Sequence, residues 1–282
     1  MSYDVSILVM YAITPCHAGS GSALGIVDLP IQRERHTNYP LIYSSSMKGS
    51  FRANFDRYKC KFDDNTKKFD KLTENIFGDK SSNDNGYAAA INISDAKILA
   101  FPMRSSVSPF VWITCSMVLE RLNRDLILAG RDSEIVKYEK LSKDNEAIVL
   151  HGDMQGDIVI EDYQVKVKGK NEIKSDFFIQ AERLLLVSDE VFNYGVSHCT
   201  QINAKIEIDQ KNGTTKDGSL RYQEELPSDT LMYCTIVWNN SRNDNKISAD
   251  NIKNAVIQVI SKYVQVGGDE TLGRGIFELT WK

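Results

Sequence analysis

The sequence predicts an α+β fold in which a β-sheet packs against helices and bears large insertions. Three observations lead to this class. Segments with strand periodicity and segments with helix periodicity follow one another along the chain, and internal repeats are not visible. Hydrophobic residues make up 42% and charged residues 26% of the chain, an ordinary balance for a globular protein. At 282 residues the chain is long enough to bury the core of one elaborated domain or of two smaller ones.

The first predicted element is a strand over residues 3–13, because apolar side chains stand at every second position. The apolar face of this half-buried strand consists of Val5, Ile7, Val9, Tyr11 and Ile13. A loop over residues 14–44 follows. Loops of this length are uncommon inside a compact domain unless they are functional or disordered. Because its interior is partly apolar, we expect this loop to be ordered and functional.

The next predicted element is a helix that begins at Ser46, whose side chain suits the N-cap position. Its apolar face consists of Met47, Phe51, Phe55 and Tyr58. A strand is predicted over residues 91–100. Ser108-Pro109 has the composition of a helix start, so a helix is expected to run through VWITCSMVLERLNRDL. The polar stretches 63–86 and 130–180 are interpreted as insertions.

A protruding β-hairpin is predicted within residues 200–226. Two strand-like segments there flank DQKNGTTKDG, whose Asn-Gly and Asp-Gly steps favour tight turns. The remaining elements are a strand over 231–238, a helix capped by Asp250 and a last strand over 275–281. The apolar residues assigned to that helix are Ile252, Val256, Val259, Ile260 and Tyr263, and Gly267-Gly268 is expected to end the helical region.

The charge balance excludes one class of nucleic-acid binder. The 34 Lys and Arg residues against 38 Asp and Glu residues give a formal net charge of -4, whereas indiscriminate coating of nucleic acid needs many unopposed cations. A local basic surface is still compatible, because residues 31–61 contain seven cations and two acids. The five scattered cysteines form no C-x-x-C pair, so neither a zinc knuckle nor a disulfide framework is indicated. With neither a signal peptide nor an apolar membrane span recognisable, we expect a cytoplasmic protein without a membrane partner.

Three stretches are rich in glycine or charge: TPCHAGSGSALGIVDLPIQRE (14–34), SSSMKGSFR (44–52) and GGDETLGRG (267–275). Glycines let a backbone approach another chain closely, and the N–H groups at a helix start suit phosphate. Lys48 and Arg52 lie four residues apart and therefore share a helix face. A nucleotide phosphate loop is excluded, because the pattern G-x-x-x-x-G-K-[ST] is absent.

In their order along the chain, these stretches resemble the RAMP superfamily of CRISPR proteins. Within it, the resemblance is to the repeating backbone subunit of the type III-B (Cmr) RNA-guided effector. VDLPIQRE and GGDETLGRG match most specifically, and FPMRSS, TCSMVLERL and YQEELPSDTLMY extend the match over nearly the whole chain. The resemblance implies a single RAMP domain over residues 1–282, with a ferredoxin-like (RRM-like) core, a palm, finger insertions and a thumb hairpin.

The resemblance also implies a function. Copies of the chain would stack into a helical filament along a guide crRNA, beside other Cmr-type subunits. The thumb would wedge into the guide–target duplex, and the subunit would act as an endoribonuclease that cuts complementary target RNA at regular intervals. Cleavage would require Mg²⁺ or Mn²⁺ and an aspartate that corresponds to Asp28, which would also be the metal ligand. Sequence specificity would come from guide pairing, because no RNP-type aromatic string is present.

Asp28 and His17 are the catalytic candidates in the first loop. A carboxylate can act as general base on a ribose 2′-hydroxyl, which contributes roughly 10²–10⁴-fold, or can hold a divalent cation. From the residues alone, a turn cap before Leu29-Pro30 is the more favoured role for Asp28, and the VDLPIQRE match reverses that order. His17 is expected either to contact the scissile phosphate or act as the acid, or to be a hydrogen-bonded strand-end histidine.

Glu224 and Glu225 are further catalytic candidates, because the family has acidic and tyrosine residues near this position. The register is open, since this chain reads YQEELP, and a solvated charge pair is the alternative for at least one of them. The RNA-binding candidates are Lys48, Arg52, Arg33, Arg35, Arg104, Gly267, Gly268 and Arg274. Alternative roles are a core brace to Asp269 or Glu270 for the last two arginines, a tight turn for the glycines, and a solvated helix face for Arg57, Lys59 and Lys61. The aromatic residues Tyr39, Phe101 and Trp112 are expected in the core.

Two functional alternatives remain open at this point. One is the homologous backbone subunit of the type III-A (Csm) effector, with the same fold and chemistry. The other is a purely structural subunit that binds crRNA without catalysis.

Overall fold

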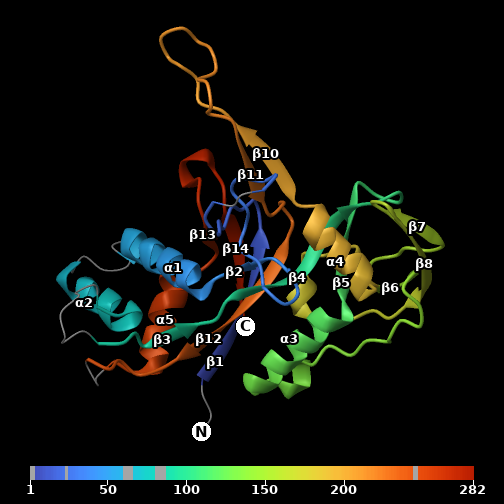
Figure 1. Cartoon of the computed structure of the whole chain (residues 1–282). Coiled ribbons are helices and arrows are strands. Elements are labelled where there is room, and N and C mark those ends of the chain that lie inside the picture. The colour runs from blue at the N-terminus through green and yellow to red at the C-terminus, as the bar shows by residue number, and fades with distance from the viewer. Residues whose placement is uncertain (1–3, 23–24, 60–65, 80–86, 244–246) are drawn as a thin grey trace.

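The computed structural model describes residues 4–22, 25–59, 66–79, 87–243 and 247–282 (Figure 1). The strands, in chain order, are β1 Asp4–Ala12, β2 Leu41–Ile42, β3 Ile91–Ile93, β4 Ala96–Arg104, β5 Phe110–Cys115, β6 Glu146–His151, β7 Asp157–Ile160, β8 Tyr163–Lys170, β9 Leu184–Val187, β10 Gln201–Lys205, β11 Arg221–Glu225, β12 Leu231–Trp238, β13 Tyr263–Gln265 and β14 Ile276–Trp281. The helices are α1 Ser44–Tyr58, α2 Thr66–Phe77, α3 Ser116–Leu128, α4 Asp189–His198 and α5 Ala249–Val259, and the short 3-10 turns are η2 Asp132–Glu134, η3 Asp176–Phe178 and η4 Glu270–Leu272. Strands and helices mix as the sequence predicts, so the α+β class is confirmed.

A single 12-stranded sheet organises the molecule. Its main path runs β13-β14-β1-β12-β4-β5-β9-β6-β8-β7, while β2 pairs with β4 and β3 pairs with β12. In Figure 1, α1, α2 and α5 lie on one side of the molecule, and α3 and α4 lie on the other. Two hydrophobic cores result. Phe51 and Phe55 of α1 belong to one core, and Leu122 of α3 and Phe192 of α4 belong to the other.

Strand β1 is an interior strand of this sheet, between β14 and β12. Ile7 and Val9 enter one core, while Leu8 and Met10 enter the other. The expectation of a half-buried strand is therefore wrong, because both faces are covered. The continuous apolar run from residue 7 to residue 10 is the signature of a strand buried on both faces.

Helix α1 begins at Ser44, two residues before the predicted start. Ser46 is not its N-cap; Tyr43 occupies that position without a side-chain cap. The N–H groups at the start of the helix donate to side chains from other parts of the chain. Ser44 N donates to Asp95 Oδ1 at 2.6 Å, and Tyr43 N donates to Gln32 Oε1 at 2.6 Å. Because the cap comes from distant residues, local sequence placed the helix start wrongly.

The helix predicted after Ser108-Pro109 is wrong in its first half. Residues 110–115 form strand β5, which pairs with β4 on one side and with β9 on the other. α3 begins only at Ser116. The β-branched and aromatic residues of VWITC favour a strand, and their burial within the sheet stabilises the strand over a helix. Tyr39, Phe101 and Trp112 lie in the core, as predicted.

The predicted insertion over residues 130–180 extends the main sheet. Strands β6, β7 and β8 join this sheet through β9. The sequence analysis predicted neither β9 nor α4. The other predicted insertion contains α2. Residues 63–65 and 80–86, together with Cys60 and Lys61, lie outside the described residues. No helix in the described part is both long and apolar enough to cross a membrane.

The C-terminal elements differ from the prediction at their ends. Ser248, not Asp250, is the N-cap of α5, and its side chain accepts from Asn251 N. The helix ends at Val259, so Tyr263 begins strand β13 instead of continuing the helix. Because β13 and β14 pair, the glycine-rich stretch between them is a loop between strands.

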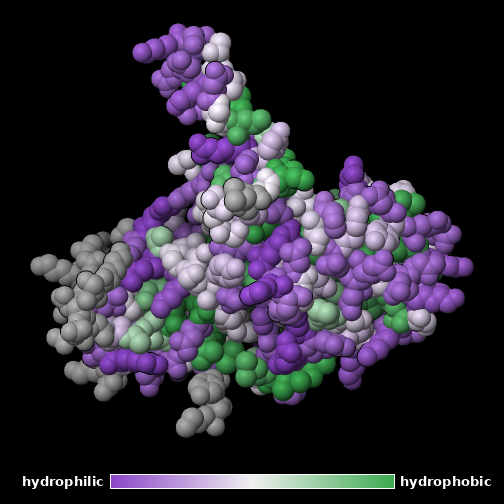
Figure 2. All heavy atoms as spheres, in the orientation of Figure 1, coloured by the Kyte–Doolittle hydropathy of each residue, from purple (hydrophilic) through white to green (hydrophobic). Residues whose placement is uncertain are grey.

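The predicted hairpin is confirmed. Strands β10 and β11 form a separate two-stranded sheet that projects from the molecule (Figure 1). In Figure 2 its tip is hydrophilic, whereas hydrophobic residues show on its stalk. The apolar residues there, each between 47% and 51% exposed, are Ile202, Ile206, Ile208 and Leu220. An exposed apolar stalk of this kind is expected to meet another molecule.

Candidate active site

The first glycine-rich loop, residues 14–34, lies along the base of the hairpin. Leu29 forms a parallel bridge with Gln223 of β11, in which Leu29 N donates to Tyr222 O at 3.0 Å and Glu224 N donates to Leu29 O at 2.9 Å. Cys16 forms an antiparallel bridge with Leu226. β11 therefore has β10 on one edge and this loop on the other. The loop is held in place by backbone hydrogen bonds, so its side chains have defined positions.

Asp28 stands where this loop meets the root of the hairpin. Its Oδ2 accepts from Tyr222 N at 2.7 Å, and the residue is half-buried. The described residues offer no hydrogen bond to Oδ1. One carboxylate oxygen thus orients the group while the other is left to accept a proton from outside the chain. Asp28 is anchored to the hairpin, and no described hydrogen bond makes it a cap for its own turn.

His17 packs against the C-terminal glycine-rich loop, residues 267–275. Its Nδ1 lies 2.7 Å from Glu224 O, and because a carbonyl oxygen only accepts, Nδ1 carries the proton and Nε2 is left for other partners. Gly268 N donates to His17 O at 2.9 Å. At Gly267, with φ of +89°, an added Cβ would lie 2.6 Å from His17 O. Gly267 is therefore needed for the close approach to His17, whereas a side chain at Gly268 would make only ordinary contacts there, 3.7 Å from His17.

Glu224 is buried, and both of its carboxylate oxygens are engaged. Oε2 accepts from Ile31 N at 3.0 Å, while Oε1 accepts from Arg33 at 2.5 Å and from Thr200 Oγ1 at 2.8 Å. The guanidinium of Arg33 also donates to Asn38 O and Val196 O. This ion pair ties the glycine-rich loop to β11, and it leaves neither member free to bind RNA or to transfer a proton.

Glu225 has no exposed surface, so the alternative of a solvated charge pair is wrong for both glutamates. Its Oε2 accepts from Asn203 Nδ2 at 2.8 Å and lies 3.3 Å from Arg274 Nε. Arg274 therefore braces a buried glutamate of β11. The two acids suggested as its partners, Asp269 and Glu270, are paired instead with Lys205 and with Arg57 of α1. These contacts favour structural roles for Glu225 and Arg274.

The predicted basic surface consists largely of cations that are already paired. Arg52 donates to Gly78 O at 2.9 Å, which joins α1 to the end of α2. Arg104 makes a bidentate pair with Glu161, although its side chain is 84% exposed. Arg35 and Lys48, by contrast, have no hydrogen bond or ion pair to any described residue. Burial, and then the charge of Arg52, lower the pKa of Lys48. A nearby phosphate would offset the charge of Arg52, so Lys48 remains a candidate for contact with the RNA backbone.

Three residues that sequence reasoning did not assign complete the site. Asp269 Oδ2 accepts from Gln223 Nε2 at 2.7 Å and pairs with Lys205 of β10. They line a cleft of about 350 Å³ at the root of the hairpin, next to Leu29. These partners are 46 and 64 residues apart along the chain, so no spacing pattern could have revealed them. Burial raises the pKa of the Asp269 carboxyl, but the hydrogen bonds from Gln223 and Lys205 outweigh it and lower the pKa overall.

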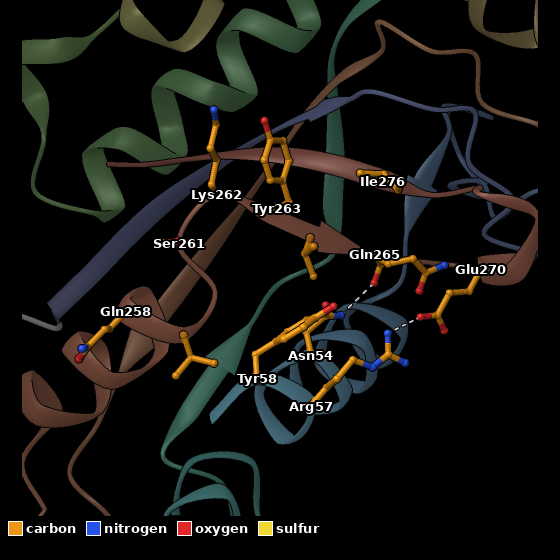
Figure 3. A pocket seen from close by; sticks show the side chains of 12 residues that line it. Asn54, Arg57, Tyr58, Gln258, Ser261, Lys262, Tyr263, Gln265, Glu270 and Ile276 are labelled. Atoms are coloured by element: carbon orange, nitrogen blue, oxygen red, sulfur yellow. Dashed lines mark hydrogen bonds and ion pairs between the residues drawn. The ribbon is translucent and has the colours of Figure 1, made fainter. Parts of the chain in front are cut away.

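A second cavity, of about 600 Å³, lies on the other side of the C-terminal glycine-rich loop. Figure 3 shows Arg57 of α1 directed toward Glu270, and Asn54 toward the backbone of Gln265. The cavity wall therefore fixes α1 to β13 and to η4. The loop is held from this side as well as from the hairpin.

The described residues provide no metal cage. No group of three or more His, Cys, Asp or Glu side chains among them is arranged to hold a metal ion. Beside Asp28, the carboxylates of Glu224 and Glu225 are engaged with the chain itself. The protein groups alone do not fit a resident divalent cation.

Known proteins share this fold. Residues 9–278 match the protein family described as the RAMP superfamily. The chain is 35% identical to the CRISPR system Cmr endoribonuclease Cmr4 of Pyrococcus furiosus, over 97% of this chain and 94% of that protein. The crystal structure of oligomeric Cmr4 from Pyrococcus furiosus has a TM-score of 0.71 at 28% identity, covering 100% of this chain and 98% of that one. A chain of the type III-B Cmr-beta complex bound to cognate target RNA has a TM-score of 0.79 at 24% identity with the same coverage, a likeness of fold alone.

Proposed function

This chain belongs to the RAMP superfamily, and from that membership we propose that it is the backbone subunit of a type III-B CRISPR effector. In this role it binds guide crRNA and cleaves complementary target RNA as an endoribonuclease. The 35% identical relative is a Cmr endoribonuclease, which favours this role over the type III-A and purely structural alternatives. We further propose that it assembles with copies of itself and with other Cmr-type subunits in the cytoplasm.

The anchoring of Asp28 to the root of the hairpin is the observation that supports this proposal most strongly. The hairpin projects outward, and the hydrogen bond from Tyr222 N holds the Asp28 carboxylate at its base. A hairpin that separates paired strands would thus present the displaced nucleotide close to a carboxylate with one free oxygen. Both parts of the reaction, distortion of the RNA and proton removal, would occur at one place.

The proposed chemistry is internal transfer at the ribose. Asp28 accepts the proton of the 2′-hydroxyl, and the resulting oxyanion attacks the adjacent phosphorus. The bond to the 5′-oxygen of the next nucleotide breaks, and that oxygen takes up a proton, for which the proposed donor is Nε2 of His17 in its imidazolium form, with Nδ1–H still donating to Glu224 O. The products are a 2′,3′-cyclic phosphate and a 5′-hydroxyl. Because an A-form helix forbids in-line geometry, displacement of the nucleotide supplies a large part of the acceleration.

The predicted requirement for Mg²⁺ or Mn²⁺ is kept as a proposal, and no step is assigned to the ion. Asp28 Oδ1 could contribute a single ligand, and water and RNA phosphates would have to supply the others. Chelation with EDTA checks this: cleavage should stop and return on addition of either cation, while unchanged cleavage in EDTA would contradict the requirement.

The catalytic assignment is tested with the assembled complex, a guide and complementary RNA. Asp28→Asn should bind guide RNA as the wild type does and cut at least 100-fold more slowly, since the general base is lost. Periodic products with cyclic phosphate ends, identified by mass spectrometry in the wild type alone, support the proposal. Equal rates for the two proteins would show that another group is the base.

A further inference from the structure

The C-terminal glycine-rich loop, residues 267–275, joins three parts of the molecule. Both of its ends contact the first glycine-rich loop, residues 14–34, because Gly268 N donates to His17 O and Gly275 N donates to Pro15 O at 2.8 Å. On its outer side, Glu270 pairs with Arg57 of α1 (Figure 3). The third contact is made by Asp269 and reaches the hairpin.

Asp269 is the point at which both strands of the hairpin are held. Its carboxylate pairs with Lys205 of β10 and accepts from Gln223 of β11. Gln223 is buried, and its amide also donates to Glu225 Oε1 at 3.2 Å. One side chain from outside the hairpin therefore fixes neighbouring positions on its two strands.

The backbone at Asp269 supports this interpretation. The residue has φ of 58° and ψ of 32°, in the left-handed region that residues other than glycine seldom adopt. Its carbonyl accepts from Leu272 N at 2.9 Å and from Arg274 N at 3.2 Å, which closes the short turn η4. Glycine would fit this backbone with less strain, so the side chain of Asp269 has to supply something that glycine lacks.

We propose that Asp269 is a positioning residue that sets where the hairpin stands relative to Asp28 and thereby selects the phosphodiester bond that is cut. This inference rests on the proposed function. Asp28 is bound to the backbone of Tyr222, one residue before Gln223, so a shift of β11 moves the carboxylate directly. A misplacement of about 1 Å can slow an enzymatic reaction about 100-fold. The residue acts through Gln223 and Lys205 and does not itself touch the RNA in this proposal.

The test compares Asp269→Gly and Asp269→Asn with the wild type in the assembled complex. Asp269→Gly relieves the backbone and removes the carboxylate. We expect unchanged guide binding, an unchanged KM, a kcat at least tenfold lower and products whose ends spread over neighbouring nucleotides. Asp269→Asn keeps an oxygen acceptor for Gln223 and should restore a single product end in part. Glu270→Gln is the matched control, because it removes the charge from the contact to α1 in the same loop and should leave the product ends unchanged.

A double variant distinguishes loss of the contact between Asp269 and Lys205 from general damage to the loop. If Asp269 acts through Lys205, then Lys205→Met combined with Asp269→Gly should be no slower than the slower single variant. Wild-type product ends and kcat in Asp269→Gly, or losses that multiply in the double variant, would overturn the proposal. Should Asp269→Gly fail to assemble, Asp269→Asn decides by the same readouts. A wild-type complex that cuts no faster than Asp28→Asn would instead refute the proposed function.

Discussion

Glu224 holds the first glycine-rich loop, residues 14–34, in place on the hairpin. A single carboxylate binds the backbone of Ile31, the guanidinium of Arg33 and the hydroxyl of Thr200. Two of these partners belong to the loop that contains Asp28, and the third precedes β10. The acid that sequence reasoning proposed for catalysis is better explained as the group that holds the catalytic loop on the hairpin.

Replacement of Glu224 by Gln tests this role. An amide placed here directs an N–H group at either Arg33 or Ile31 N, so one buried donor loses its acceptor. We expect the free energy of unfolding in urea to fall by about 3 kcal/mol, the lower part of the range for breaking a buried ion pair. Cleavage should fall with it, because the loop loosens.

Glu207→Gln provides the matched control for that measurement. Glu207 pairs with Lys216 on the exposed hairpin, where both side chains are about 60% exposed. Such a pair contributes less than about 1 kcal/mol. Equal stability losses in the two variants would contradict the assignment of Glu224 as a buried anchor.

At the scale of elements, the hairpin is separate from the rest of the fold. Its strands pair with each other, and no described residue between 201 and 225 belongs to either hydrophobic core. The apolar stalk is exposed, and the tip is formed by polar turns at Gly213 and Gly218, both with positive φ. This element therefore adds nothing to core burial.

Shortening the hairpin tests its function without disturbing the core. When residues 208–218 are replaced by a two-residue Asn-Gly turn, the melting temperature should stay within about 2 °C of the wild type, since almost no apolar surface is uncovered. Guide binding should persist, and periodic target cleavage should disappear. Val107→Ser, an equally exposed apolar position outside the hairpin, serves as control. Products with the same spacing after shortening would rule out the thumb assignment.

At the scale of the whole molecule, the charge balance has a structural explanation. Most of the cations between residues 31 and 61 that the structure describes are engaged with acids or carbonyl groups of the same chain. Lys48 and Arg35 are the two that make no hydrogen bond or ion pair with a described residue. A basic stretch with two available cations binds RNA weakly by itself. Affinity for a long guide then has to come from several copies on one strand.

The salt dependence of guide binding measures this number. Counterion release gives a slope of about 0.7 per phosphate contact for single-stranded RNA, so a subunit that uses Lys48 and Arg35 should show a slope of about 1.4 per copy. Lys48→Met should lower it by about 0.7, whereas Lys140→Met, at an exposed lysine on another part of the surface, should not. A slope several times larger per copy in the wild type would mean that many more cations reach the RNA.

Sequence reasoning predicted the elements whose signal is local. The β12 strand, the hairpin with its Asn-Gly and Asp-Gly turns, and the helix around Phe51 and Phe55 are present because periodicity and turn chemistry act over a few residues. It failed at β5 and at the start of α1, where pairing with β9 and the distant acceptor Asp95 decide the structure. Helix propensity and capping preferences cannot report on such partners.

The sequence by itself determined the family, the α+β class, the projecting hairpin and the loop that contains Asp28, because each is encoded in a contiguous motif. Only the tertiary structure decided which charged groups are free to act. Two glutamates and two arginines at the root of the hairpin are residue types that are common in active sites, yet they neutralise one another. Arg33 pairs with Glu224, and Arg274 pairs with Glu225. Burial makes an unpaired charge costly, so partners drawn from distant segments fix these side chains and leave Asp28 with an available oxygen.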